Sequence, residues 1–118
     1  MNFESTPEFE KDVKRLKKKW RSLDDDIIDA KLVISSVYEL DEPFAQRFFN
    51  GKRATKLIVT DEYEVVKMRL DCKSLGNHRK TRLVFIVIRT KSTVKLIELY
   101  AKNSNEREDS RRIKKYLT

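Results

Sequence analysis

The stretch Glu64-Val65-Val66-Lys67-Met68-Arg69-Leu70 decides the fold, because basic and apolar side chains alternate along it. Successive side chains of a β-strand point to opposite faces of a sheet, so this alternation predicts a strand with Lys67 and Arg69 on one face. A second strand-like run, Arg82 to Ile88, follows soon after and opens on another arginine. If the two runs pair as a hairpin, Lys67, Arg69 and Arg82 come close together on a rigid sheet. Three clustered cations are suited to binding phosphate oxygens.

Further strands can be placed on both sides of this hairpin. The run Arg82 to Ile88 is apolar on both faces, which predicts a central strand that is covered on each side. Strands are also expected at Tyr63 to Leu70 and Val94 to Tyr100, and the short connections between the three favour an antiparallel meander. Asn2 to Glu4 could form a short edge strand. The region from Glu39 to Thr60 shows no clear pattern, beyond a helix break at Pro43 and an apolar run at residues 57–59, which is either a brief strand or the approach to the first long one.

Two helices are expected near the N-terminus and one near the C-terminus. Thr6-Pro7-Glu8 predicts a helix start: Thr6 supplies a hydroxyl cap, Pro7 occupies the first helical position and Glu8 places an acidic residue in the first turn. Ser22-Leu23-Asp24-Asp25 resembles a capping box for a second helix, and Asn105-Glu106-Arg107-Glu108 is a plausible cap for a final helix that ends near Leu117. The expected buried face of the first helix comprises Phe9, Val13, Leu16 and Trp20, and the apolar stripe of the second comprises Leu23, Ile27, Ile28, Leu32, Ile34 and Tyr38. The predicted fold is α+β, with an antiparallel β-sheet packed against two N-terminal helices and a C-terminal helix, in a single domain over residues 1–118.

Composition excludes several kinds of site. The chain has 27 lysines and arginines against 19 acidic residues, and the net charge of +8 favours a polyanionic partner such as nucleic acid, the ribosome, an acidic protein or an anionic membrane. Two glycines, Gly51 and Gly76, cannot build a glycine-rich phosphate loop. One histidine, His78, and one cysteine, Cys72, cannot form the usual metal sites. We therefore expect no cofactor and no metal ion. Without a signal peptide or a bilayer-spanning run, a cytoplasmic location is expected.

The ordered combination of these segments resembles the RelE/ParE superfamily of toxins from type II toxin–antitoxin systems. The likeness covers nearly the whole chain, and the segments that carry it are Thr6-Pro7-Glu8-Phe9-Glu10-Lys11-Asp12, Val66-Lys67-Met68-Arg69-Leu70, Thr81-Arg82-Leu83-Val84-Phe85 and Leu96-Ile97-Glu98-Leu99-Tyr100-Ala101-Lys102. RelE-like members cleave mRNA in the ribosomal A site without a metal ion, by attack of the 2′-hydroxyl on the adjacent phosphodiester. The resemblance implies a metal-independent, ribosome-dependent mRNA endonuclease whose partners are a cognate antitoxin, the ribosome and mRNA.

The resemblance also implies roles for individual residues. Lys67 and Arg69 would lie on the active strand, Arg82 would stabilise the pentacoordinate phosphate, and Lys102 would be a further basic residue of the catalytic site. The residues expected to contact RNA more generally are Lys14, Lys17, Lys18, Arg79 and Lys80.

Two departures from the family pattern keep other interpretations open. The family's nucleases often carry a tyrosine or histidine after the last strand, whereas residues 103–109 contain neither and Asp109 stands about where a tyrosine is expected. Arg69 is a poor general base because a guanidinium stays protonated. The alternative is a non-catalytic protein of the same fold, either a ParE-like gyrase inhibitor or an RNA-binding module. On residue pattern alone, Lys67 and Arg69 could equally form the solvated face of a half-exposed sheet.

Overall fold

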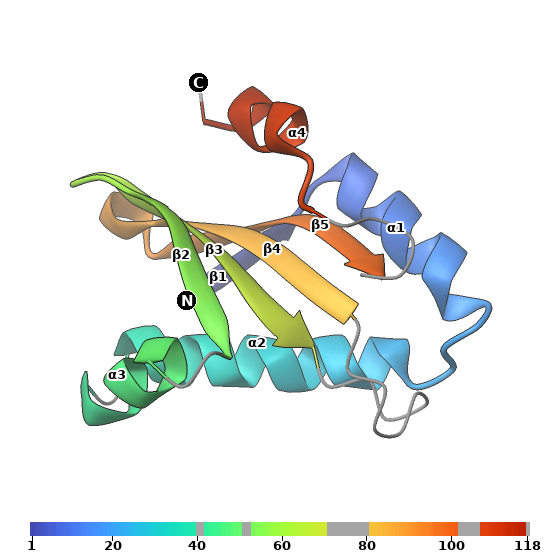
Figure 1. Cartoon of the computed structure of the whole chain (residues 1–118), viewed down its shortest axis with the longest axis horizontal. Coiled ribbons are helices and arrows are strands. Elements are labelled where there is room, and N and C mark those ends of the chain that lie inside the picture. The colour runs from blue at the N-terminus through green and yellow to red at the C-terminus, as the bar shows by residue number, and fades with distance from the viewer. Residues whose placement is uncertain (40–41, 51–52, 71–80, 102–106, 118) are drawn as a thin grey trace.

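The computed structural model describes residues 1–39, 42–50, 53–70, 81–101 and 107–117. One five-stranded sheet in the spatial order β1-β5-β4-β3-β2 forms the centre of the molecule (Figure 1). Its strands are β1 (Asn2–Ser5), β2 (Ala54–Val59), β3 (Tyr63–Leu70), β4 (Thr81–Ile88) and β5 (Thr93–Ala101). The helices are α1 (Pro7–Lys17), α2 (Leu23–Glu39), α3 (Glu42–Asn50) and α4 (Ser110–Lys115), and a 3-10 turn, η2 (Arg89–Lys91), precedes β5.

The predicted meander is confirmed, because β4 pairs antiparallel with both β3 and β5. The sheet as a whole is mixed, however, since the edge strand β1 runs parallel to β5. Parallel neighbours need a long connection, and here the rest of the domain supplies it. The brief strand expected at residues 57–59 is part of the longer edge strand β2, whose pairing with β3 shifts register between Lys56 and Ile58.

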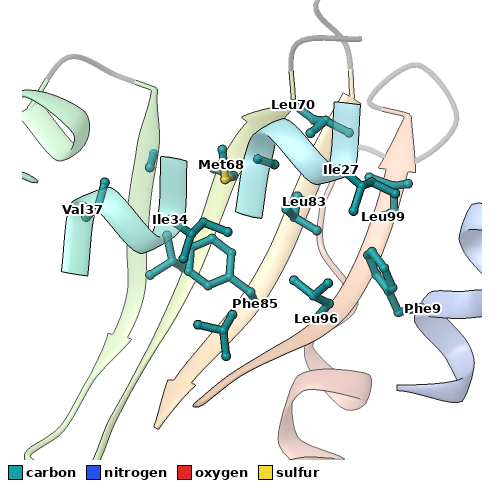
Figure 2. Packing of buried hydrophobic residues seen from close by; sticks show 14 of the residues in the cluster. Phe9, Ile27, Ile34, Val37, Met68, Leu70, Leu83, Phe85, Leu96 and Leu99 are labelled. Carbon is teal, nitrogen blue, oxygen red and sulfur yellow. The ribbon is translucent and has the colours of Figure 1, made fainter. Parts of the chain in front are cut away.

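The main core lies between α2 and one face of the sheet, and Figure 2 shows its packing. Ile27 and Ile34 of α2 lie over Met68, Leu83 and Phe85 of the central strands. The buried apolar positions of α2 follow a three- and four-residue spacing: Leu23, Ile27, Ala30, Ile34 and Val37. The predicted apolar stripe of α2 is therefore wrong at Ile28 and Leu32, whose side chains are 55% and 64% exposed. These two positions do not belong to the buried series, so they lie on the face of α2 that points away from the sheet.

Three helix starts show which local signals in the sequence were correct. Thr6 caps α1 as predicted, with its hydroxyl oxygen accepting a hydrogen bond from the Phe9 amide at 3.2 Å. By contrast, Pro43 does not prevent a helix, because it lies in the first turn of α3, where a missing amide hydrogen leaves no intrahelical bond unmade. The expected cap at residues 105–108 is also wrong, since the Asp109 carboxylate caps α4 by accepting from the Arg111 and Arg112 amides.

The opposite face of the sheet is partly covered by α4 (Figure 1). Ile113 of α4 packs there on a smaller cluster that includes Val65, Val84, Ile86 and Tyr100. Both faces of β4 are thus covered, which confirms it as the central strand. None of the helices in the described part of the chain is long and apolar enough to cross a membrane.

Candidate functional site

Three neighbouring strands place Arg69, Arg82 and Tyr100 in one row on the sheet face opposite α2. Arg69 of β3 is the direct cross-strand partner of Arg82 on β4, and Arg82 is the direct partner of Tyr100 on β5. Directly opposed residues have Cβ atoms about 4.5–5.5 Å apart, so the two guanidinium groups share one small region. Lys67 lies on the same face, two residues before Arg69 along β3. The structure therefore brings Lys67, Arg69 and Arg82 together, and this set is called the cationic cluster below.

The two arginines are in different environments. The Arg69 side chain is exposed, and within the described part of the chain it has no carboxylate partner. Arg82 is partly buried, and its guanidinium donates to the Thr81 carbonyl at 3.2 Å. Burial lowers the pKa of Arg82, and the charge of Arg69 lowers it further, yet a guanidinium stays protonated in proteins. Two neighbouring guanidinium groups repel each other, and an anion bound between or above them offsets this repulsion.

Lys67 differs from the arginines because it has an internal carboxylate partner. Its ammonium donates to the Glu108 carboxylate at 3.1 Å, and the two side chains are 28% and 19% exposed. Desolvation alone would raise the pKa of Glu108, but hydrogen bonds from its own amide and from Lys67, with the charge of Lys67, hold that pKa below its ordinary value. Sequence reasoning missed Glu108 as a contact of the cluster, because no periodicity specifies where a residue outside the strands will point.

Tyr100 and Glu98 form the β5 side of this region. Burial raises the pKa of Tyr100 to about 12, the negative charges of Glu108 and Glu98 acting in the same direction, so its hydroxyl is protonated at neutral pH. The Asp109 amide donates to the Glu98 carboxylate at 2.8 Å, and burial raises the pKa of Glu98. Asp109, at the position where a family tyrosine is expected, is thus engaged through its backbone with β5 and through its side chain as the cap of α4.

The segment that carries Glu108 is anchored through α4 to α1 and β5. The buried Asp12 carboxylate of α1 accepts from the Arg112 guanidinium at 2.6 Å and from the Leu99 amide at 3.0 Å. Arg112 also donates to the Ile97 carbonyl at 3.1 Å, and Lys115 donates to Glu8 at 2.8 Å. These contacts fix the position of α4, and therefore of Glu108, relative to the sheet.

The remaining predicted site residues lie elsewhere or outside the described residues. Lys14 and Lys17 lie on α1 and Lys18 directly follows it; all three side chains are exposed, and Lys17 forms an ion pair with Asp24 of α2. These lysines belong to a helix packed beside β5, not to the sheet face of the cationic cluster. The residues that fall outside the described part are Lys102, Arg79 and Lys80, together with Cys72 and His78. Among the residues that the structure describes, no group of three or more His, Cys, Asp or Glu residues could hold a metal ion.

Comparison with known proteins supports the fold. No protein-family model matches the sequence, and no curated protein matches it. Among solved structures, a chain in the crystal structure of the archaeal RelE–RelB complex from Pyrococcus horikoshii OT3 is similar, with 18% identity and a TM-score of 0.55. The match covers 86% of this chain and 93% of that chain. At this identity the similarity shows the fold alone, a RelE-like mixed α+β fold, as the resemblance in the sequence predicted.

Proposed function

We propose that this chain is the toxin of a toxin–antitoxin pair, and that it cleaves ribosome-bound mRNA without a metal ion. The observation that carries the proposal is the cationic cluster, which the β3–β4 register gathers on one sheet face of a RelE-like fold. The similar archaeal chain comes from a RelE–RelB complex, which supports an antitoxin partner for this chain as well. The net charge of +8 favours an acidic segment in that partner.

The cluster suits the charge changes of RNA cleavage by the neighbouring 2′-hydroxyl. In that reaction the 2′-hydroxyl loses its proton to water and its oxygen attacks phosphorus. A 2′,3′-cyclic phosphate forms as the bond from phosphorus to the 5′-oxygen breaks, and the leaving 5′-oxygen takes up a proton from solvent. Negative charge grows on the phosphate oxygens in the transition state, where each well-placed donor contributes about 3 kcal/mol. Arg69 and Arg82 cannot accept the 2′-proton, so we assign them to phosphate binding and charge stabilisation. Lys67 contributes the third positive charge of the cluster.

Replacement of Arg82 tests this proposal. Arg82→Ala should abolish growth arrest and the cutting of translated mRNA, because it removes the central charge of the cluster. Arg47→Ala is a matched control, since Arg47 is an exposed arginine on α3 and its loss changes the net charge equally. Cleavage is measured by mapping mRNA 5′-ends on purified ribosomes with each variant. Cutting that survives Arg82→Ala together with Lys67→Ala would show that the cluster is not the catalytic site.

A second candidate function is inhibition by binding alone, as in ParE-like gyrase inhibitors. It is favoured by the engagement of Lys67 with Glu108 and by the use of Asp109 as a helix cap where a family tyrosine is expected. A binding protein of this kind would induce DNA damage responses while leaving mRNA intact. The same expression experiment therefore separates the two functions.

A further inference from the structure

The contact between Glu108 and Lys67 assigns a specific role to this carboxylate. We propose that Glu108 occupies the position of a phosphate at Lys67, so that an RNA phosphate must replace the carboxylate before it can bind all three cations. The inference rests on the proposed function, because it requires the cationic cluster to be the phosphate site. It identifies Glu108 as a residue that lowers the affinity of this site for anions.

The geometry of the pair supports this role. A carboxylate and a phosphate present the same kind of charged oxygen acceptor to an ammonium group. The Lys67 ammonium donates to Glu108 at 3.1 Å, within the range of a direct hydrogen bond. Both side chains are largely shielded from water, at 28% and 19% exposure, so the pair is less screened than an exposed ion pair. A phosphate that approaches Lys67 therefore competes with an acceptor that is already in place.

The neighbouring contacts hold Glu108 in position without involving its carboxylate. Asp109, the next residue, donates from its amide to Glu98 and caps α4 with its side chain. Arg112 of α4 is in turn held by Asp12. Rotation about the side-chain bonds of Glu108 can thus release Lys67 while α4 stays docked. Replacement by a phosphate needs a rotamer change of Glu108, which also gives up the hydrogen bond from its own amide.

The two arginines determine which anions can make this replacement. Arg69 is exposed and has no carboxylate partner among the residues described, so it can contact a phosphate while Glu108 still holds Lys67. Arg82 lies beside it in the register of the sheet. A phosphate that contacts the arginines is brought next to Lys67, where it competes with Glu108. An anion that contacts Lys67 without contacting the arginines competes with Glu108 less effectively. The arrangement favours an RNA backbone positioned across the cluster over a freely diffusing anion.

A binding experiment with a non-cleavable RNA tests the proposal separately from catalysis. The probe is a fluorescein-labelled, fully 2′-O-methylated oligouridylate of about 12 nucleotides, a length typical of single-strand sites. Its affinity is measured by fluorescence anisotropy for wild type, Glu108→Gln and Glu108→Ala. The matched control is Glu62→Gln, which removes an exposed carboxylate in the turn between β2 and β3 and changes the net charge equally. Both Glu108 variants should bind about fivefold more tightly than the control, as expected for removal of one competing ion-pair partner.

The same measurement in a Lys67→Ala background completes the test. There the gain from Glu108→Gln should fall to that of Glu62→Gln, because the site of competition is gone. Equal affinities of the Glu108 and Glu62 variants, or a gain that persists without Lys67, would overturn the proposal. Loss of ribosomal mRNA cleavage in Glu108→Gln with no gain in affinity would also overturn it, and would make Glu108 a proton acceptor instead. If Arg69→Ala and Arg82→Ala leave the affinity of the wild type unchanged, the proposed function fails together with the inference.

Discussion

Glu64 is a buried carboxylate that is surrounded by three donors. Its carboxylate is 4% exposed, and it accepts from the Tyr38 hydroxyl at 2.8 Å, from Arg89 and from Lys56 at 3.3 Å. Desolvation alone would raise the pKa of Glu64, but the hydrogen bonds from Tyr38 and Arg89, with the charge of Lys56, hold it below its ordinary value of 4.5. Glu98 has the opposite balance, since burial raises its pKa and the Asp109 amide opposes this only in part.

These opposite shifts predict opposite effects of pH on two amide substitutions. A carboxyl group whose pKa is lowered by folding contributes stability above its unfolded pKa, and this contribution is lost as the pH falls through the folded pKa. Glu64→Gln should therefore destabilise the protein by about 2 kcal/mol at pH 7, and by less as the pH falls below 4.5. Glu98→Gln should be neutral or stabilising at pH 7, because it removes a carboxylate that burial disfavours. Urea unfolding at several pH values measures the change in the free energy of unfolding for each variant. If this change depends on pH in the same way for both variants, the opposite pKa shifts of Glu64 and Glu98 are wrong.

At the scale of elements, Asp12 joins α1, β5 and α4. It lies on the buried face of α1, where apolar residues were expected, and its carboxylate accepts from the Leu99 amide and from Arg112. The amide that it binds lies past the end of β1, whose last paired residue, Ser5, is opposite Leu96. Asp12 thus replaces a hydrogen bond that the sheet does not supply, and it fixes the position of α4 with the same group.

Replacement of Asp12 should weaken all three elements together. Asp12→Asn keeps the shape of the side chain but leaves the Arg112 guanidinium without its charged partner, which should lower the free energy of unfolding by about 3 kcal/mol. Glu10→Gln on the exposed face of the same helix is the control, and it should change stability by less than about 0.5 kcal/mol. Urea unfolding gives both values, and hydrogen exchange at the Leu99 amide should accelerate in the Asp12 variant. If Asp12→Asn lowers the free energy of unfolding no more than Glu10→Gln does, the contacts of Asp12 with Leu99 and Arg112 do not stabilise the fold.

The elements show how far the sequence could predict this fold and its site. Strand periodicity and the Thr6 cap are local signals, so β3, β4, β5 and the start of α1 were predictable. The same periodicity placed Lys67, Arg69 and Arg82 on one face, because two strands that pair directly leave little freedom. The parallel pairing of β1 and the contact of Glu108 with Lys67 depend on segments far apart in the chain, and no local pattern specifies them. The α2 stripe failed at Ile28 and Leu32 because an apolar residue on an exposed helix face gives the same signal as a buried one.

At the scale of the molecule, two groups of basic side chains among the described residues lie on different parts of the surface. The cationic cluster lies on the sheet beside α4, and the lysines of α1 lie at the edge of the sheet next to β5. Internal carboxylates neutralise one member of each set, since Glu108 pairs with Lys67 and Asp24 pairs with Lys17. The number of charges that can displace counterions from RNA is therefore smaller than the net charge of +8 suggests. This difference is measurable because each phosphate contact releases counterions.

The salt dependence of RNA binding should distinguish the lysines of α1 individually. For a single strand, the slope of log affinity against log salt falls by about 0.7 for each phosphate contact that is lost. Lys14→Ala and Lys18→Ala should each reduce the slope by about that amount, whereas Lys17→Ala should reduce it less because Lys17 is engaged with Asp24. Anisotropy titrations of the oligouridylate at potassium chloride concentrations between about 50 and 200 mM give the slopes. An equal effect of Lys17→Ala would show that Asp24 does not hold this lysine in solution. Unchanged slopes in all three variants would remove α1 from the RNA-binding surface and leave the sheet face as the contact.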